Sequence, residues 1–135
     1  MLSRRAVVRT LAIGMLFIGS FPAFAKSERS NPIRMLDTDG DGTVDLAEAK
    51  KAASAVFDGL DRDRDGTLDK RELAGRLNDK ELAAADPDHD GTLTKDEYLA
   101  LVEQRFNTAN PDKDGTLDAK ELNSAAGKAL LRLLR

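Results

Sequence analysis

Cysteine is absent from the sequence. The chain can therefore form neither a disulfide framework nor a zinc site with thiolate ligands. Aromatic residues are also few, because the 135 residues include no tryptophan, one tyrosine and five phenylalanines. After residue 25 the only aromatic residues are Phe57, Tyr98 and Phe106, and the only methionine is Met35. A chain of this length can form one small domain, but this composition predicts a thin core that needs another source of stability.

A hydrophobic run long enough to cross a membrane is missing as well. The apolar run at residues 11–21 has about eleven residues, whereas a membrane-spanning helix needs about twenty. Three arginines precede this run and an A-x-A site ends at Ala25, which is the pattern of an export signal. We therefore expect a signal peptide over residues 1–25, cleavage after Ala25, a periplasmic mature protein and no stable insertion into a membrane. Residues 3–9 also resemble a twin-arginine signal, so the Sec and twin-arginine routes both stay open.

Basic residues are fewer than acidic residues once the signal is removed. The whole chain has 21 lysines and arginines against 24 aspartates and glutamates. The first 25 residues hold three of the basic residues and none of the acidic ones, which leaves 18 against 24 and a net charge of −6. This balance argues against nucleic acid and anionic membrane surfaces as partners, and it favours cations.

What the sequence does contain is an acidic segment of twelve residues that occurs four times. The pattern is D-x-[DN]-x-[DN]-G-x5-E, which is typical of an EF-hand calcium loop, and only Asn110 at position 1 of the fourth copy departs from it. We term the copies loops 1 to 4. They are DTDGDGTVDLAE at 37–48, DRDRDGTLDKRE at 61–72, DPDHDGTLTKDE at 86–97 and NPDKDGTLDAKE at 110–121.

The residue types in these loops suit a hard cation. Positions 1, 3 and 5 supply oxygens that converge on the ion, glycine at position 6 permits a sharp turn, and the backbone carbonyl at position 7 adds an oxygen. Position 9 binds directly or through water, and the glutamate at position 12 binds with both oxygens. Single acidic turns are often only solvated loops, but four copies in register predict metal sites, with the weakest at loop 4. The predicted ligands are Asp37, Asp39, Asp41, Thr43, Asp45, Glu48, Asp61, Asp63, Asp65, Thr67, Asp69, Glu72, Asp86, Asp88, Asp90, Thr92, Thr94, Glu97, Asn110, Asp112, Asp114, Thr116, Asp118 and Glu121.

The loops are unusually close together, which constrains the topology. Only 12 or 13 residues separate the glutamate of one loop from the start of the next. Ordinary EF-hand pairs place two helices in such a gap, and here there is room for about one. Apolar residues spaced by three and four predict a helix over 46–60 that holds loops 1 and 2 about 20 Å apart, and a second helix from loop 3 to loop 4. Between loops 2 and 3, Gly75 and a capping box of Asn78 and Glu81 predict a break.

These elements predict an all-α fold of residues 26–135 with four EF-hands around a small three-helix core. The two long helices run antiparallel, so that loops 2 and 3 pair at one end and loops 1 and 4 at the other. The apolar residue at position 8 of each loop makes a short strand contact. The tail after its predicted cap, Ser124, forms the third helix, with Leu130, Leu131, Leu133 and Leu134 on its apolar face. The alternative for this basic tail is a partner-binding or membrane-surface helix.

Nothing in the sequence indicates catalysis. There is no set of histidine, carboxylate and nucleophile and no phosphate-binding loop, so we expect no enzymatic activity. The sole histidine, His89, lies at the non-ligating position 4 of loop 3 and is expected to be exposed. Tyr98 follows the last ligand of loop 3 and is expected to pack against the site or cap it.

The chain resembles the lanmodulins, a family of bacterial lanthanide-binding proteins, over residues 31–135. The resemblance rests on the short spacing of the loops, on Pro87 and Pro111 at position 2, on aspartate at position 9 and on the ending AGKALLRLLR. It implies selective binding of trivalent lanthanides such as La, Ce and Nd, folding on binding, and a role in handling lanthanides for methanol-oxidising dehydrogenases, with such a dehydrogenase or an uptake system as partner. The chain departs from the family pattern at Thr38, Arg62 and Thr94.

The number of carboxylates gives a separate argument about the ion. Attraction grows in proportion to the charge of the ion, whereas the dehydration cost grows with its square, so a trivalent ion prefers sites with many anionic ligands. At their ligand positions loops 1 and 2 offer five carboxylates each, and loops 3 and 4 offer four each, which makes 18 of the 24 acidic residues. Without metal these charges should leave the chain largely unfolded.

Two functions follow from the sequence. The first is a periplasmic lanthanide carrier or buffer. The alternative is a periplasmic Ca²⁺ buffer or sensor, although calcium sensors of the calmodulin kind use methionine-rich faces and the mature chain has one methionine.

Overall fold

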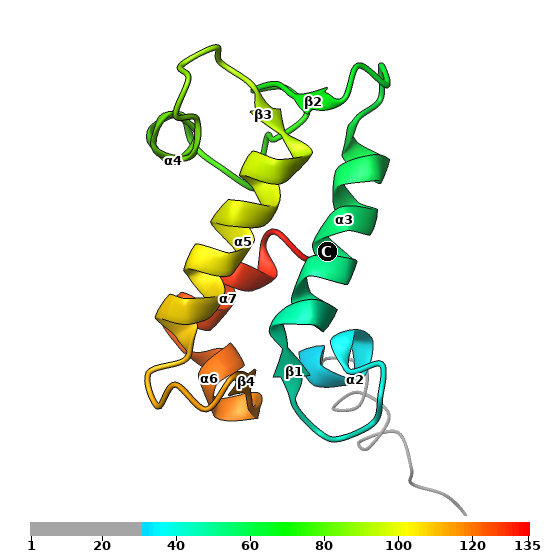
Figure 1. Cartoon of the computed structure of the whole chain (residues 1–135), viewed down its shortest axis with the longest axis vertical. Helices are drawn as coiled ribbons and strands as arrows, with labels where there is room; N and C mark the ends of the chain where they lie inside the picture. Colours follow the sequence, from blue (N-terminus) through cyan, green and yellow to red (C-terminus); the bar gives the residue numbers. More distant parts are fainter. Residues whose placement is uncertain (1–30) are drawn as a thin grey trace, which may run out of the picture. The chain divides into compact units, whose positions relative to one another are not determined.

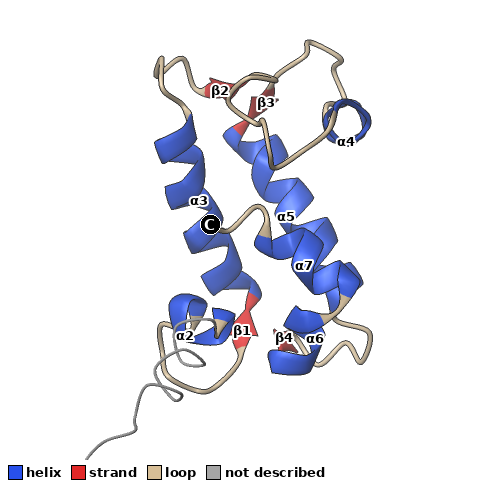
Figure 2. Ribbon diagram, turned by 180° about the vertical axis from the view of Figure 1, so that it is seen from behind, coloured by secondary structure: helices blue, strands red, loops and turns tan. Residues whose placement is uncertain are grey.

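The fold is known from a computed structural model, which describes residues 31–135 (Figure 1). The predicted signal peptide, residues 1–25, lies outside the described residues, as do residues 26–30. The described part is mostly helical, with four two-residue strands (Figure 2). Its elements are α2 (Pro32–Leu36), β1 (Val44–Asp45), α3 (Leu46–Leu60), β2 (Thr67–Leu68), α4 (Asp79–Ala85), β3 (Leu93–Thr94), α5 (Lys95–Ala109), β4 (Thr116–Leu117), α6 (Ala119–Asn123) and α7 (Ala125–Leu131).

Two helices of fifteen residues, α3 and α5, run side by side in opposite directions (Figures 1 and 2). The helix predicted over 46–60 is confirmed as α3. The helices meet through small and aromatic side chains, and the rings of Phe57 and Tyr98 pack edge to face with their centroids 5.7 Å apart. In α5 the apolar residues Val102, Phe106 and Ala109 are buried, Leu99 is half-buried and Tyr98 is fully buried.

The strands pair the loops at the two ends of these helices. β1 pairs with β4 in antiparallel register, with Val44 opposite Leu117. At the other end β2 pairs with β3, with Leu68 opposite Leu93. These four position-8 side chains are fully buried, so each strand contact also closes one end of the core.

Between loops 2 and 3 the chain makes a series of turns and then forms α4. Gly75 adopts a positive φ of 85°, a conformation that glycine tolerates without strain. The predicted capping box is confirmed, because the side chain of Asn78 accepts from the N–H of Glu81 at 2.8 Å and the Glu81 carboxylate accepts from the N–H of Asn78 at 2.9 Å. The break directs the chain back to loop 3.

The tail closes the core. The predicted cap is confirmed, since the hydroxyl of Ser124 accepts from the N–H of Gly127 at 3.0 Å. Helix α7 packs on α5 and α6, and the four tail leucines are buried, as predicted. The prediction of one continuous helix was wrong at its end, because α7 stops at Leu131. The N–H groups of Leu133 and Leu134 instead donate to carbonyls three residues back, which is the tighter turn common at helix ends.

Ion pairs connect neighbouring elements on the outside of this core. Lys50 of α3 pairs with Glu103 of α5 at 2.7 Å, and Lys95 of α5 pairs with Asp58 of α3 at 2.9 Å. Both pairs are substantially exposed, so each contributes at most about 1 kcal/mol to stability. Within residues 31–135, none of the helices has the length and apolar character needed to cross a membrane.

Candidate metal sites

The glutamate at position 12 of each loop is oriented by the start of the following helix or turn. In loop 1 the Asp45 side chain accepts from the N–H of Glu48 at 2.8 Å, and Glu48 Oε2 accepts from the N–H of Asp45 at 3.0 Å. The same reciprocal bonds occur in loops 2, 3 and 4, with Asp69, Thr94 and Asp118 at position 9. Position 9 therefore fixes the direction of the glutamate in all four loops.

The aspartate at position 1 is held by the turn that follows it. One carboxylate oxygen of Asp37 accepts from the N–H of Gly42 at 2.9 Å, and Asp61 and Asp86 make the equivalent bond to the glycine at position 6 at 3.0 and 2.8 Å. The glycines reach φ values near 83–90°, which a side chain would strain. The turn thus curls around its own first ligand.

Position 4 has an unusual backbone conformation in every loop. Arg64, His89 and Lys113 have φ values of 57–58°, in the left-handed region that non-glycine residues seldom adopt, and loop 1 has Gly40 at this place. Their side chains are exposed, so the prediction for His89 is confirmed. The repeated left-handed conformation at position 4 indicates that all four loops follow one defined path.

Carboxylates gather in loops 1 to 3. In each of these loops one carboxylate oxygen from each of positions 1, 3 and 12 lies within 4.8 Å of the other two, and a hard cation prefers such all-oxygen clusters. The three groups are Asp37, Asp39 and Glu48; Asp61, Asp63 and Glu72; and Asp86, Asp88 and Glu97.

The electrostatics of these clusters show the repulsion that a cation would relieve. In loop 1 the N–H of Asp41 lowers the pKa of Asp39, but desolvation and the neighbouring carboxylates outweigh it, so that this pKa is raised overall. The same balance raises the pKa of Asp63 in loop 2, and in loop 3 the hydrogen bond with Asp86 is the main cause of the raised pKa of Asp88. A carboxyl group that holds its proton beside other carboxylates marks a place where an ion of opposite charge binds well.

Position 5 is engaged with position 7. The carboxylates of Asp41, Asp65, Asp90 and Asp114 each accept from both the N–H and the hydroxyl of the threonine two residues later, at 2.8–3.2 Å. Each of these bonds uses Oδ1, which leaves Oδ2 available for an ion. The threonine therefore has a second role besides its predicted carbonyl ligand.

Loop 4 differs at its first ligand. Asn110 is buried, with 6% of its surface exposed, and its Oδ1 atom is buried without a hydrogen-bond partner. A buried acceptor in this state is unfavourable by about 1–3 kcal/mol. The predicted carboxylate ligands of this loop, Asp112, Asp114, Asp118 and Glu121, follow the arrangement of the other loops.

The loops also differ at position 2, where two of them make a hydrogen bond to the position-12 glutamate that we did not predict. Thr38 donates from its N–H at 2.6 Å and from its hydroxyl at 3.0 Å to Glu48 Oε1, and the N–H of Arg62 donates to Glu72 Oε1 at 3.0 Å. Pro87 and Pro111 have no N–H to donate there. The presence or absence of proline at position 2 was the signal in the sequence from which this difference could have been found.

Comparison with protein families matches the EF hand family to three segments, residues 33–51, 54–75 and 77–102, which contain loops 1, 2 and 3. The comparison with curated proteins found no match.

Proposed function

We propose that this EF-hand protein selectively binds trivalent lanthanide ions and folds around them. The observation that supports this best is the set of acidic clusters at positions 1, 3 and 12 of loops 1 to 3, whose oxygens converge within 4.8 Å. Loops 1 and 2 add two further carboxylates each, at positions 5 and 9. Five anionic ligands around one ion favour a charge of +3 over +2.

Loop 4 is a fourth EF-hand in this proposal. Its glutamate is oriented like those of the other loops, and its strand β4 pairs with β1 of loop 1. A cation in loop 4 would give the buried Oδ1 of Asn110 the partner that it lacks. Because asparagine is neutral, this site is the weakest of the four.

Metal binding supplies much of the stability of the fold. Eighteen carboxylates occupy ligand positions in four short loops, and the core between them has only Phe57, Tyr98 and Phe106 as aromatic residues. Without ions the repulsion within the loops opposes the strand pairs that close both ends of the core. The free energy of binding is therefore largely the free energy of folding.

We also propose that the protein is exported, that it works in the periplasm as a lanthanide carrier or buffer, and that it has no enzymatic activity. The export signal and the negative net charge of the sequence support this role. A lanthanide-dependent dehydrogenase or an uptake system is the partner that the resemblance to lanmodulins implies.

The test is a titration of helicity. The chain from residue 26 to 135 is followed by circular dichroism against free La³⁺ and free Ca²⁺ in chelator-buffered solution. We expect low helicity in excess chelator and a full response at a free La³⁺ concentration at least a hundredfold below that needed for Ca²⁺. A response to Ca²⁺ at an equal or lower concentration would instead establish the second candidate, a calcium buffer or sensor, which the four-carboxylate loops 3 and 4 favour.

A further inference from the structure

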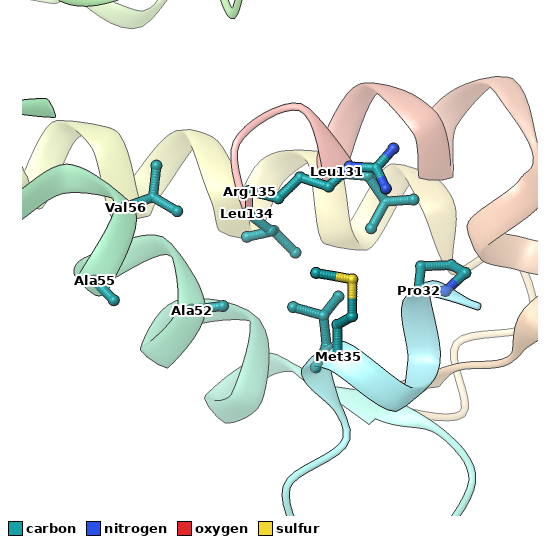
Figure 3. Close-up of a pocket in the computed structure, with 9 residues that line it drawn as sticks. Pro32, Met35, Ala52, Ala55, Val56, Leu131, Leu134 and Arg135 are labelled. Carbon is teal, nitrogen blue, oxygen red and sulfur yellow. The ribbon is translucent and has the colours of Figure 1, made fainter. Parts of the chain in front are cut away.

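An apolar groove of about 230 Å³ lies between α2, α3 and the C-terminal tail, and none of the predicted metal ligands lines it. Figure 3 shows Met35 extending from α2 into the space between α3 and the tail, with Leu134 facing it from the tail. The walls are formed by Leu36 of α2, Ala52 and Val56 of α3, and Leu131 of α7.

Met35 is the one large hydrophobic side chain that is exposed among the described residues, with 63% of its surface accessible. It lies at the mouth of the groove rather than alone on the surface. Methionine adapts its shape to different apolar partners, and for this reason it is common on protein-binding surfaces. The exposed apolar area is therefore concentrated at one place suited to an inserted side chain.

The tail wall of the groove is anchored close to the metal loops. The hydroxyl of Tyr98 donates to the carbonyl of Leu133 at 2.7 Å, and Arg76 Nη2 donates to the backbone oxygen of Arg135 at 2.9 Å. Tyr98 directly follows the last ligand of loop 3, and Arg76 lies four residues after the last ligand of loop 2. Because these anchors depend on the folded ends of loops 2 and 3, the groove is complete only when those loops are folded.

Arg135 is the one charged residue among those that line the groove. Lys51 lies one helical turn before Ala55, another lining residue, and is exposed. The acidic residues at the same distance along the chain are engaged elsewhere, because Asp37 and Glu48 are predicted metal ligands and Asp58 pairs with Lys95 at 2.9 Å. No aspartate or glutamate is among the lining residues. The local charge favours an acidic partner.

Binding of trivalent ions changes the net charge from negative to positive, which also favours an acidic partner. Residues 31–135 carry 16 lysines and arginines against 23 aspartates and glutamates, a net charge of −7. Four ions of charge +3 bring this to +5, whereas four Ca²⁺ ions bring it only to +1. An acidic partner is therefore repelled by the metal-free chain and attracted by the lanthanide-loaded one.

We infer that this groove is a docking site for an acidic segment of a partner protein, which inserts an apolar side chain beside Met35 and pairs its carboxylates with Arg135 and Lys51. Docking takes place in the lanthanide-loaded state. The inference rests on the proposed lanthanide binding and adds to it a surface by which the loaded protein is recognised.

The test uses the chain from residue 26 to 135 loaded with diamagnetic La³⁺ and labelled with ¹³C at the methyl group of Met35. The probe is a synthetic amphipathic peptide of leucine, alanine and glutamate, and the control peptide has lysine in place of glutamate. We expect the acidic peptide to shift the Met35 methyl resonance and to bind at least tenfold more tightly than the basic one. Ala55→Glu should lower this affinity at least tenfold, whereas the matched control Ala83→Glu, at an exposed alanine of α4 outside the groove, should leave it unchanged.

Circular dichroism of the same samples separates the two proposals. If La³⁺ does not fold the chain, the proposed function is wrong and the docking inference falls with it. If the chain is loaded and folded but the methyl resonance does not move, or if both peptides bind equally well, the docking site alone is wrong. A dimer found by sedimentation with Met35 in its interface would also overturn the inference, because the occupant would then be a second copy.

Discussion

The hydroxyl of Tyr98 donates a hydrogen bond of 2.7 Å to the backbone carbonyl of Leu133, which lies 35 residues further along the chain. Both residues are fully buried. The bond joins α5, just after the last ligand of loop 3, to the tail that follows loop 4. One buried polar contact thus connects the end of loop 3 to the tail.

Tyr98→Phe should destabilise the lanthanide-loaded protein by about 1–3 kcal/mol, because it leaves the buried Leu133 carbonyl without its donor. Urea unfolding of the La³⁺-loaded chain measures this loss. Thr108→Ala is the matched control, since the Thr108 hydroxyl also donates to a backbone carbonyl, at 2.9 Å, but from an exposed position. A loss for Tyr98→Phe no larger than that of the control would show that the buried bond adds nothing to stability.

The phenol of Tyr98 should titrate late in the folded protein. Burial raises its pKa from the usual 10.0 to about 12, because the ionised form loses its hydration. The folded-state pKa lies above the unfolded one, so the contribution of this group to stability is fully present below pH 10 and is lost as the pH rises through about 12. Ultraviolet absorbance of tyrosinate in the La³⁺-loaded protein measures the midpoint. A midpoint near 10 in a sample that remains helical would contradict the buried position.

Replacing a helical glycine by alanine should have opposite effects on stability at Gly127 and at Gly59. A Cβ atom at Gly127 would lie 2.6 Å from the Cα and carbonyl oxygen of Leu122 and closer still to the carbonyl of Glu121, because α7 approaches α6 through this residue. Gly127→Ala should therefore destabilise the loaded protein by about 2–4 kcal/mol. At Gly59 in α3 a Cβ meets nothing within 4 Å, so Gly59→Ala should stabilise it by about 0.5–1 kcal/mol. Thermal unfolding compares the two variants, and a tolerated Gly127→Ala would refute the close approach of the helices.

Asn110→Asp should strengthen the site in loop 4, because it adds a fifth anionic ligand. We expect the affinity of that loop for a trivalent ion to rise by about tenfold, which corresponds to about 1.4 kcal/mol. Asn110→Ala removes the oxygen and should abolish the site. Titration calorimetry with La³⁺ resolves the stoichiometry in both variants. Four tight sites in the alanine variant would show that Asn110 is not a ligand.

Local features of the fold could be predicted from the sequence because their causes lie within a few residues. The length of α3 follows from the loop spacing, and the caps at Asn78 and Ser124 follow from the residue types at helix starts. The short helices were harder to predict from the sequence. α2 and α6 have five residues each, too few to be stable alone, and they depend on contacts with the rest of the core.

Long-range contacts were not predictable in the same way. Glu81 was identified as half of a capping box, but it also pairs with Arg105 at 3.1 Å and with Arg132 at 3.2 Å. The N–H of Asn78 and these two cations lower the pKa of Glu81, although burial opposes them. Such a network depends on how α4, α5 and the tail come together, which no local pattern contains. The convergence of positions 1, 3 and 12 is different, since the loop pattern itself predicts it.

The strand pairs enclose chain segments of very different length. Leu68 and Leu93 are 25 residues apart, whereas Val44 and Leu117 are 73 residues apart. Closing the longer segment costs about 1 kcal/mol more in chain entropy. We therefore expect the end with loops 2 and 3 to assemble first when ions are added, and the end with loops 1 and 4 to set the rate at which the last ions are captured.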